Sequence, residues 1–484
     1  MKELEHLLSE RVFHYFEDFC KVPHASYHCS VAADYIEAFA SKHHLRCRRD
    51  EADNVIVWKE ASRGRELDKG IMLQGHLDMV AVKDEGVDFN FDTDGIRLIA
   101  DGDWISAEGT TLGGDDGIAV AMMLAVLEDE ALSHPALECL FTTDEEVGLL
   151  GATALDTRDL TSQYMLNLDS EEEPIIYIGC SGGARVTLEL PLTEFTADTE
   201  ITAREVAIKG LIGGHSGFDI NRGLASANQL MLGILKDLSA EFQFGISFLK
   251  GGTVANAIPV EARTTILIPK GEAKQFDKRM ESLTEQLIHQ WQKKEPGLQV
   301  QWQESPLSEK PDAFILSHDI LHAWESIPCG VIAMNPTLPG FVETSSSLGV
   351  ITLEDGILRL IANIRSDKEE AKEAMKEQCR TIAKNTGGKI DIKGDYPGWP
   401  MKENSDFQQL ASRVYEEIHG KKPILETIHA GLECGIFSQR MPELDIISTG
   451  PDVLDGHTTH ERMSISSIDR VYRFVRRILE TSGR

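Results

Sequence analysis

The stretch LECLFTTDEEVG (residues 137–148) holds the main clue to the architecture of this chain. Its first half is an apolar run of strand length, which is typical of a strand buried in a sheet with helices on both faces. The carboxylates of Asp144, Glu145 and Glu146 follow at the end of that run. Because like charges this close repel each other, we expect a cation or a reaction that requires them.

Apolar runs and helical patterns alternate on both sides of this stretch. Such alternation predicts an α/β sheet covered by helices. The predicted strands are NVIVW (54–58), IMLQG (71–75), LECLFTT (137–143) and YMLNL (164–168), and the predicted helices span residues 3–20, 30–44 and 117–130.

The pattern changes after IYIGCSGG (176–183). Segments such as RVTLELPL (185–192) and EVAIKG (205–210) alternate apolar and polar residues, as half-buried strands do. These features predict an α+β domain with a one-sided sheet. Its further predicted elements are helices over 226–242 and 272–294 and the strands ARTTILIP (262–269) and GILRLIANIR (356–365).

The Gly- and Pro-rich segment GDYPGWP (394–400) is typical of a hinge. The α/β pattern returns after it, at 407–420, 445–450 and 466–480. We therefore predict a catalytic α/β domain formed by residues 1–185 and 394–484, interrupted by an inserted α+β domain over 186–393. A chain of 484 residues is also too long for one ordinary core.

The composition argues against two classes of partner. Asp and Glu outnumber Lys and Arg by 79 to 48, giving a formal net charge of −31. We therefore expect no binding to nucleic acid or to anionic membranes. Charged runs such as DSEEEP (169–174) and SDKEEAKEAMKE (366–377) are expected to be solvated faces, with Asp169 as an exception.

No segment indicates a membrane span or an oxidising compartment. The longest apolar run, IAVAMMLAVL (118–127), fits a buried helix. The N-terminal stretch MKELEHLLSERVFHYFEDFC lacks the apolar core of a signal peptide, which predicts a cytoplasmic protein. The eight cysteines show no CxxC pairing and are expected to be buried thiols.

Polar residues follow the predicted strands at four points. They are His76 and Asp78 after IMLQG, Asp144–Glu146 after LECLFTT, Asp169 after YMLNL, and His457 in the loop after DIISTG. In open α/β sheets ligands bind beyond the carboxyl ends of the strands, so we expect these side chains to meet in one crevice. The Gly-rich loop LGGDDG (112–117) would add Asp115 and Asp116.

A cluster of imidazoles and carboxylates suits a transition metal such as zinc, and the excess of carboxylates indicates two divalent ions. A pair of ions needs a bridging carboxylate and further ligands for each ion. Asp115 could bridge the ions. His76 and Asp169 would complete one site. Glu146 and His457 would complete the other.

Two carboxylates remain for other roles. Residues two apart in a strand face the same side, so Asp78 could accept the second ring proton of His76 and fix its tautomer. Glu145, next to a ligand, would act as general base on a metal-bound water. Each motif alone is commonly structural, but their joint order at successive strand ends favours a di-metal site.

This ordered set of motifs resembles the di-zinc metallopeptidase family of carboxypeptidase G2, aminoacylase-1 and the bacterial dipeptidases. Nearly the whole chain is most similar to its aminoacyl-histidine dipeptidase branch (peptidase D, Xaa-His dipeptidase). The motifs that carry the resemblance are VPHASYH (22–28), GHLDMV (75–80), GTTLGGDDGIA (109–119), NLDSEEEPIIYIGCSGG (167–183), HAGLECGIF (429–437) and GPDVLDGHTTHER (450–462).

The resemblance implies the same metal ligands, the same roles for Asp78 and Glu145, and a cis peptide after Asp115. The chain departs from the family pattern at Gly75 and in GGDDG, where relatives read Ala and GADNG. Asp116 thereby adds a carboxylate, whose ordinary role would be to cap the following helix.

The resemblance also implies that the inserted domain serves as a lid and in dimerisation. GGHSG (213–217) places His215 where the family uses a histidine of the partner subunit to stabilise an oxyanion. GGTVANAIP (251–259) places Asn256 as a substrate hydrogen-bonder. Arg365 would bind the terminal carboxylate of the peptide. Gly431 would line the pocket through its backbone.

We therefore expect a cytoplasmic, homodimeric metallodipeptidase that cleaves Xaa-His dipeptides, with β-alanyl-histidine as a candidate substrate. Zinc is the first candidate for the two metals, with cobalt or manganese as alternatives. A broader di- or tripeptidase and an N-acyl amino acid deacylase remain alternatives within the superfamily. A non-enzymatic peptide-binding protein would lack a ligand or base that this chain retains. A two-metal phosphoesterase would need basic groups that the motifs do not supply.

Overall fold

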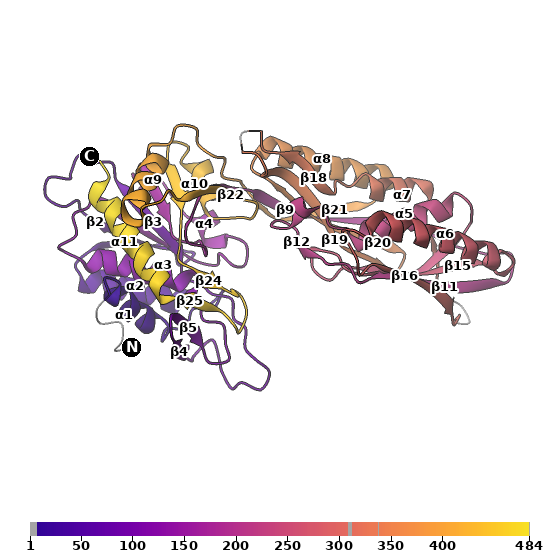
Figure 1. Cartoon of the computed structure of the whole chain (residues 1–484), viewed down its shortest axis with the longest axis horizontal. Coiled ribbons are helices and arrows are strands. Elements are labelled where there is room, and N and C mark those ends of the chain that lie inside the picture. The colour runs from indigo at the N-terminus through magenta and orange to yellow at the C-terminus, as the bar shows by residue number, and fades with distance from the viewer. Residues whose placement is uncertain (1–6, 308–311, 337, 484) are drawn as a thin grey trace. The chain divides into compact units, whose positions relative to one another are not determined.

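The structure is a computed structural model that describes residues 7–307, 312–336 and 338–483. The chain forms two compact units, whose elements are labelled in Figure 1. Unit 1 runs up to Cys180 and includes Gly398–Ile428 and the chain from Leu432 onward. Unit 2 comprises Ser181–Pro397 and His429–Gly431.

Unit 1 is a mixed α/β structure. Its helices are α1 (Glu10–Phe19), α2 (Ser30–Lys42), α3 (Gly114–Glu128), α4 (Leu150–Ala154), α9 (Asp406–His419), α10 (Cys434–Arg440) and α11 (Ile465–Thr481). Its strands are β1 (Arg46–Arg49), β2 (Val55–Lys59), β3 (Ile71–His76), β4 (Leu98–Asp101), β5 (Trp104–Ala107), β6 (Leu137–Thr142), β7 (Tyr164–Asn167), β8 (Ile175–Cys180), β22 (Ile424–Ile428), β23 (Asp445–Ser448), β24 (Val453–Leu454) and β25 (Arg462–Ser464). Residues 3–6 of the helix predicted over 3–20 lie outside the described residues.

The main sheet of unit 1 has the strand order β1-β2-β6-β3-β7-β23-β8-β22. The four central strands β6, β3, β7 and β23 are mutually parallel, so their carboxyl ends share one edge. All residues of β3, β6 and β7 are buried, as predicted for continuous apolar runs covered on both faces. A smaller antiparallel sheet has the order β24-β25-β5-β4.

Helix α3 contributes its whole apolar run, 118–127, to the core of unit 1. The helix is regular only after its first residues, because Asp115 and Asp116 have non-helical backbone angles. A cis peptide bond joins these two residues, which confirms the expectation from the family resemblance. The two carboxylates therefore lie in an irregular turn at the edge of the sheet, before the buried helix begins.

Unit 2 is built on a large sheet with the order β16-β11-β15-β13-β19-β20-β9-β21. Its strands are β9 (Gly182–Pro191), β10 (Thr193–Glu194), β11 (Ile201–Lys209), β12 (Gly214–His215), β13 (Gly245–Gly251), β14 (Ala257–Ile258), β15 (Ala262–Pro269), β16 (Gln299–Ser305), β17 (Phe314–Ile315), β18 (Gly330–Met334), β19 (Val342–Glu354), β20 (Ile357–Ser366) and β21 (Lys389–Tyr396). Its helices are η2 (Ile220–Arg222), α5 (Ala227–Ser239), η3 (Lys270–Glu272), α6 (Ala273–Trp291), α7 (His318–Glu325) and α8 (Glu369–Thr386).

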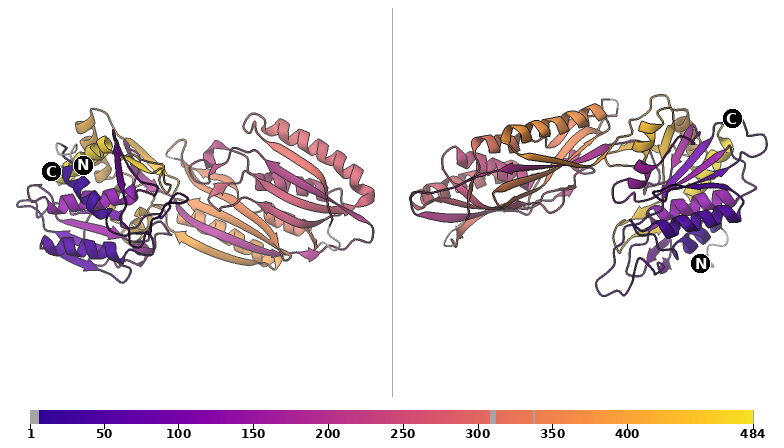
Figure 2. Two further views of the ribbon diagram at one scale, coloured as in Figure 1. Left: turned by 90° about the horizontal axis from the view of Figure 1, so that it is seen from below. Right: turned by 180° about the vertical axis from the view of Figure 1, so that it is seen from behind.

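The sheet of unit 2 buries one face. In β9, Val186, Leu188 and Leu190 are buried, whereas Thr187 and Glu189 between them are only partly buried. The helices of unit 2 lie along the sheet, as Figure 2 shows, and share one hydrophobic core with the inward-facing strand residues. This is the one-sided α+β arrangement that the alternating pattern predicts.

Two charged runs are less exposed than predicted. In the run 366–377, Lys372 and Lys376 of α8 are buried, and their Nζ atoms lie 2.8 and 2.5 Å from the two carboxylate oxygens of Asp395. In the run 169–174, Glu173 is partly buried and lies 2.8 Å from Arg470. The prediction of solvated faces is wrong at these positions, because a charge with a partner elsewhere in the fold can be buried.

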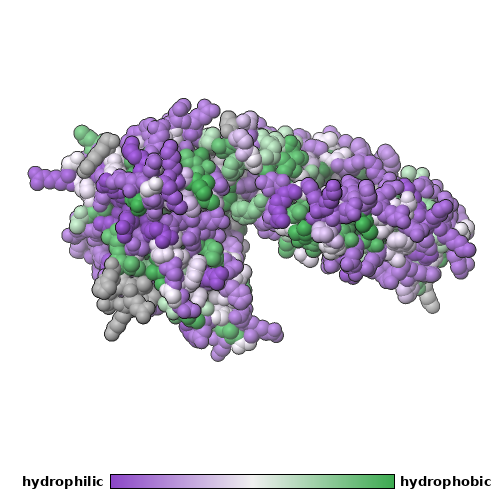
Figure 3. All heavy atoms as spheres, in the orientation of Figure 1, coloured by the Kyte–Doolittle hydropathy of each residue, from purple (hydrophilic) through white to green (hydrophobic). Residues whose placement is uncertain are grey.

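The surface and the cysteines agree with the composition. Hydrophilic side chains cover most of the face shown in Figure 3. Within the described ranges, no helix is both long and apolar enough to cross a membrane. All eight cysteines are described, none forms a disulfide, and only Cys47 and Cys329 are more than marginally exposed.

Candidate active site

Loops at the carboxyl edge of the parallel strands bring imidazoles and carboxylates together in unit 1. His76 ends β3, Glu145 and Glu146 follow β6, and Asp169 follows β7. Asp115 comes from the start of α3, and His457 from the loop between β24 and β25. Ligand atoms lie within 4.8 Å of one another in three groups, which are His76/Asp116/Asp169, His76/Glu145/Glu146 and Asp115/Glu146/His457.

Asp115 lies between the two imidazoles. Its Oδ1 is 3.1 Å from Nε2 of His76, and its Oδ2 is 3.1 Å from Nε2 of His457. On the first side, Asp169 Oδ1 is 3.7 Å from the same nitrogen of His76. On the second side, Glu146 Oε1 is 2.8 Å from Nε2 of His457. One carboxylate thus faces two histidine–carboxylate pairs, one with each of its oxygens.

The two ring nitrogens of His76 face different partners. Its Nδ1 is 2.9 Å from the backbone carbonyl oxygen of Asp78. A carbonyl oxygen only accepts hydrogen bonds, so Nδ1 carries a proton, and Nε2 is the ring nitrogen that faces Asp115. The carboxylate of Asp78 is farther away, with Oδ1 3.5 Å from Nδ1. The closer acceptor for the Nδ1 proton of His76 is therefore the backbone carbonyl of Asp78. The sequence predicts the side-chain carboxylate of Asp78 in this role.

The carboxylate of Asp78 instead anchors the loop after β6. Its Oδ1 accepts the backbone N–H of Glu145 at 2.9 Å, and its Oδ2 accepts that of Glu146 at 3.3 Å. Ser26 donates a further hydrogen bond to Oδ2 at 2.8 Å. Burial raises the pKa of Asp78, but the adjacent His76 and the hydrogen bonds from Glu145 and Ser26 outweigh burial and lower the pKa. A negative charge therefore holds this loop in place.

A second carboxylate, Glu461, holds the loop that presents Asp115. Its two oxygens accept the backbone N–H groups of Leu112, Gly113 and Gly114 at 2.7, 3.1 and 2.7 Å. The N–H of Asp115 lies 3.3 Å from Oε1. The sequence interpretation missed this role, although Glu461 belongs to the motif GPDVLDGHTTHER. Alternation and spacing give no signal for a side chain that binds backbone groups so far away along the chain.

Asp116 takes a role other than the expected helix cap. Its Oδ2 accepts the backbone N–H of His76 at 3.1 Å, and the N-cap position of α3 is Gly113. This contact explains why Gly75 lacks a side chain. A Cβ atom on Gly75 would lie 2.5 Å from Asp116 Oδ2 and 2.8 Å from the Cβ of Ala119.

The cluster concentrates negative charge in a buried place. Burial raises the pKa of Glu145 well above its usual range, and the charges of Glu146 and Asp115 raise it further. Burial and the neighbouring aspartates also raise the pKa of Asp169. Hydrogen bonds from the His457 ring to the carboxylates of Asp115 and Glu146 raise the pKa of His457 to about 11. Without cations, the cluster therefore reduces the repulsion between its carboxylates by binding protons. Bound cations would reduce the same repulsion.

The donor set fits a pair of divalent cations. Imidazole nitrogens with carboxylate oxygens are ligands that zinc, cobalt and manganese accept. Asp115 offers one oxygen to each side, as a bridging ligand does, and His76 already presents the nitrogen that a metal would bind.

The remaining predicted site residues belong to unit 2. His215 lies in β12, which pairs with β14 directly after Asn256, and the N–H of Ser216 donates to the carbonyl of Asn256 at 2.8 Å. The backbone N–H groups of Gly217 and Phe218 donate to Nδ1 of His215, both at 3.2 Å. Its proton is therefore on Nε2. Burial and the charge of Arg365 lower the pKa of His215 to about 4, so the ring is neutral.

Arg365 and His215 both lie next to Gly217. A Cβ on Gly217 would lie 3.1 Å from the ring of His215 and 3.2 Å from Nε of Arg365. Arg365 is buried, and its Nε has no hydrogen-bond partner among the described residues. Gly431 packs against the ring of Tyr396, whose hydroxyl lies 3.5 Å from Nη1 of Arg365. A buried guanidinium with an unused N–H group is suited to an anionic ligand.

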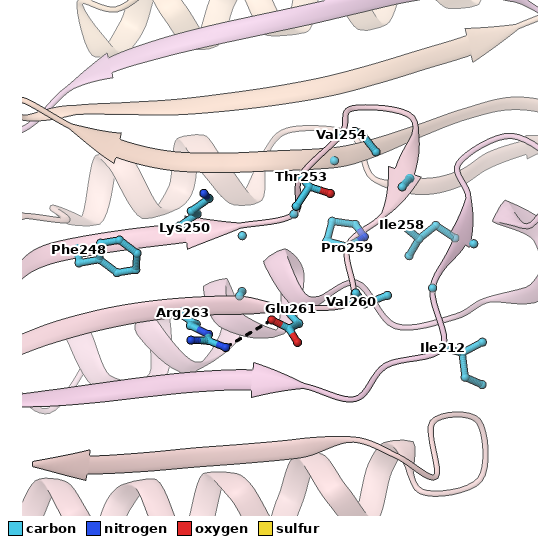
Figure 4. Close-up of a pocket in the computed structure, with 17 residues that line it drawn as sticks. Ile212, Phe248, Lys250, Thr253, Val254, Ile258, Pro259, Val260, Glu261 and Arg263 are labelled. Carbon is cyan, nitrogen blue, oxygen red and sulfur yellow. Dashed lines mark ion pairs between the residues drawn. The ribbon is translucent and has the colours of Figure 1, made fainter. Parts of the chain in front are cut away.

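Unit 2 also contains an apolar cavity of about 470 Å³, shown in Figure 4. Ile212, Phe248, Ile258 and Val260 contribute to its lining, and the ion pair between Glu261 and Arg263 lies at its side. None of the predicted site residues lines it. The cavity lacks the acidic and imidazole groups of the cluster in unit 1, so it offers no comparable chemistry.

The fold and the site define a class of enzyme. A model of the peptidase family M20/M25/M40 matches residues 72–481, and the chain belongs to this family. It is therefore a hydrolase that acts on peptide bonds, which confirms the family predicted from the motifs.

Particular relatives are similar over the full length. The chain is 35% identical over 481 residues to the cytosol non-specific dipeptidase of Escherichia coli (strain K12), covering 99% of each chain. The crystal structure of aminoacylhistidine dipeptidase from Vibrio alginolyticus is 33% identical and superposes with a TM-score of 0.91, covering 100% of this chain and 99% of the other. Aminopeptidase PepT from Bacillus cereus shares the fold, with 17% identity and a TM-score of 0.57 over 99% of this chain and 100% of the other.

Proposed function

We propose that this protein is a metal-dependent dipeptidase that cleaves Xaa-His dipeptides. The observation that carries the proposal is Asp115, which directs one carboxylate oxygen to His76 and the other to His457. The two full-length relatives support the reaction, since both are named as dipeptidases.

The proposed metal ligands are the two histidines and three carboxylates predicted from the sequence. They are His76, Asp115, Glu146, Asp169 and His457. Two divalent ions held by them, with zinc as the first candidate and cobalt or manganese as alternatives, would polarise the scissile carbonyl and lower the pKa of a water molecule.

Glu145 is the proposed general base. Asp78 fixes its backbone, and its neighbour Glu146 is a proposed ligand, so the Glu145 carboxylate would act on a water held by the ions. It accepts the proton of the water as the oxygen attacks the carbonyl carbon. It then returns that proton to the amine nitrogen as the peptide bond breaks.

Unit 2 supplies the proposed substrate contacts. Arg365 binds the C-terminal carboxylate of the dipeptide, and Asn256 and the backbone of Gly431 bind its polar groups. The Nε2–H of neutral His215 donates to the oxyanion that forms at the carbonyl. We place the boundaries of this lid and dimerisation domain at 186–393.

We further propose that the protein is a homodimer in which His215 acts in the active site of the partner subunit. The exposed edge of unit 2 supports association. Strand β18 pairs only with β19 among the described residues, and its side chains Val331, Ile332 and Met334 are 37%, 50% and 46% exposed. An unpaired strand edge with apolar side chains is suited to pairing with another chain. The cytosolic relative supports a cytoplasmic location.

Breadth of specificity separates two candidate functions. The Vibrio alginolyticus relative is named for aminoacylhistidine substrates, whereas the Escherichia coli relative is named as non-specific. The second name favours a broader dipeptidase as the alternative. Hydrolysis of Ala-His, Ala-Leu, a tripeptide and N-acetyl-histidine by metal-stripped protein, before and after addition of zinc, cobalt or manganese, distinguishes them.

We expect metal to restore activity and Ala-His to be cleaved with the highest kcat/KM. Equal rates on Ala-His and Ala-Leu would contradict the preference for histidine and support the broader dipeptidase. Restored hydrolysis of N-acetyl-histidine alone would identify a deacylase. No activity with any of the metals would contradict the proposed reaction.

A further inference from the structure

A row of polar side chains crosses the sheet of unit 1 below the acidic cluster. Gln74 of β3, Asn167 of β7 and Ser448 of β23 are directly opposite one another in the strand register. The Nδ2 group of Asn167 donates to Oε1 of Gln74 at 2.6 Å. The hydroxyl of Ser448 donates to Oδ1 of Asn167 at 2.5 Å. The three residues form a continuous hydrogen-bonded chain across three strands.

The row continues at both ends. On one side, Oε2 of Glu433 accepts hydrogen bonds from Nε2 of Gln74 at 2.5 Å and from the hydroxyl of Thr142 at 2.6 Å. On the other side, the hydroxyl oxygens of Ser448 and Ser170 are 2.5 Å apart. We call this set, Thr142, Glu433, Gln74, Asn167, Ser448 and Ser170, the polar row.

The polar row is enclosed in the core. Gln74, Asn167, Ser448 and Glu433 have no exposed surface, and Thr142 has none either. Buried polar groups cost free energy unless each finds a partner, and an apolar side chain would fill the same space without that requirement. The arrangement therefore calls for a role beyond filling the core.

Its positions are related to the cluster by the strand repeat. Gln74 comes two residues before His76, and Asn167 comes two residues before Asp169. Residues two apart in a strand point to the same face, so the Gln74 side chain lies directly below that of His76. The hydrogen bond from Asn167 to Gln74 therefore joins β3 and β7 two residues before His76 and Asp169.

We propose that the polar row sets the distance between His76 and Asp169, and thereby the affinity of one of the two metal sites. Its members are positioning residues, since they act through the strands that carry the ligands. This inference rests on the proposed di-metal function and deepens it. It also assigns a role to Glu433, which lies in the motif HAGLECGIF without a predicted function.

Two substitutions break the row, and two serve as controls. Gln74→Met keeps the length of the side chain but removes its hydrogen bonds to Asn167 and Glu433. Ser448→Ala leaves Oδ1 of Asn167 without its donor. Glu433→Gln keeps an oxygen that accepts from Gln74 and should preserve the row. Glu138→Met removes another buried carboxylate of the same sheet, whose partners Thr161 and Ser162 lie outside the row.

The test is a Co²⁺ titration of metal-stripped protein, followed by the visible absorption of the bound ion. In a His457→Ala background, only the site of His76 and Asp169 keeps its full ligands. There we expect Gln74→Met and Ser448→Ala to raise the Kd for Co²⁺ about 10-fold or more, as loss of outer-shell partners does. In a His76→Ala background, which keeps Glu146 and His457, we expect the same substitutions to leave the Kd unchanged.

Two results would overturn the inference. One is an unchanged Kd for both row variants in the His457→Ala background. The other is an equal loss in both backgrounds, or an equal loss in Glu138→Met, because general destabilisation would then explain the effect. A parent protein that binds no Co²⁺ would contradict the di-metal proposal itself and the inference with it. A parent that binds two ions, with row variants that match it, would contradict the inference alone.

Discussion

The carboxylate of Asp78 accepts the backbone N–H of Glu145 at 2.9 Å. This contact joins a residue of the segment after β3 to the residue proposed as general base. It also defines the position of the loop after β6, because the same carboxylate accepts the N–H of Glu146. The position of the base therefore depends on a charge that lies two residues beyond the neighbouring strand β3.

Removing that charge should impair the enzyme without unfolding it. We expect Asp78→Ala to lower kcat/KM by about 10- to 100-fold, because both backbone N–H groups lose their acceptor and His76 loses a nearby carboxylate. Ser26→Ala removes only one hydrogen bond to Asp78 and should have a smaller effect. Steady-state kinetics with Ala-His measures both. Equal losses in the two variants would argue against the anchoring role of the carboxylate.

Glu145 and Glu146 are adjacent, but their substitution should impair the enzyme in different ways. We expect Glu145→Ala to lower kcat by at least about 100-fold with unchanged metal content, since a general base contributes about 10²- to 10⁴-fold. We expect Glu146→Ala to lose metal, because it removes a ligand. Elemental analysis of dialysed protein, together with kcat, separates the two. Full turnover by Glu145→Ala would remove it from the base role.

Arg365 should act on the carboxylate of the substrate. We expect Arg365→Ala to raise KM for Ala-His by at least about 10-fold, since a charge-assisted hydrogen bond contributes about 1.5–3 kcal/mol. The amide of Ala-His, which lacks the carboxylate, provides the control substrate. Its kcat/KM should differ little between wild type and variant. An equal loss on both substrates would indicate a structural role for Arg365.

His429 should make the stability of the protein depend on pH. Burial and the charge of Arg365 lower its pKa to about 3, and Nε2 lies 2.7 Å from the hydroxyl of Ser345. The unfolded chain has an ordinary histidine pKa of about 6.5. Between these values the unfolded state binds a proton that the folded state does not, so the free energy of unfolding falls as the pH drops below about 6.5.

The variant His429→Gln, which keeps a polar side chain near Ser345, does not titrate. We expect its free energy of unfolding to fall less steeply between pH 6 and 4 than that of wild type, by up to about 1.4 kcal/mol per pH unit. Urea unfolding at several pH values measures the difference. Parallel curves for the two proteins would show that His429 is protonated equally in both states.

Most of the fold follows from local pattern. Continuous apolar runs predict the buried strands β3, β6 and β7, and strict alternation predicts the one-sided strands of unit 2, because burial on one or two faces leaves a period in the sequence. The same logic places the acidic and imidazole residues at one edge, since they follow parallel strands. These predictions depend only on residues near each other along the chain.

The parts that sequence reasoning missed depend on distant partners. Glu461 binds backbone groups of a loop far earlier in the chain, and Glu433 reaches Gln74 in the same way. Lys372 and Lys376 follow the helical pattern of a charged surface, yet Asp395 allows both to be buried. Spacing carries no information about which distant group completes a hydrogen bond, so a single sequence gives no signal for these roles.

The hydrogen bonds from Leu112, Gly113 and Gly114 to Glu461 have a consequence for how the protein is made. The loop that presents Asp115 leaves the ribosome long before the carboxylate that shapes it, and His457 also comes late. Nearly all of unit 2 is synthesised between these two parts of unit 1. Unit 2 can therefore fold during synthesis while the acidic cluster is still unformed, so peptidase activity should arise only after His457 and Glu461 have been synthesised.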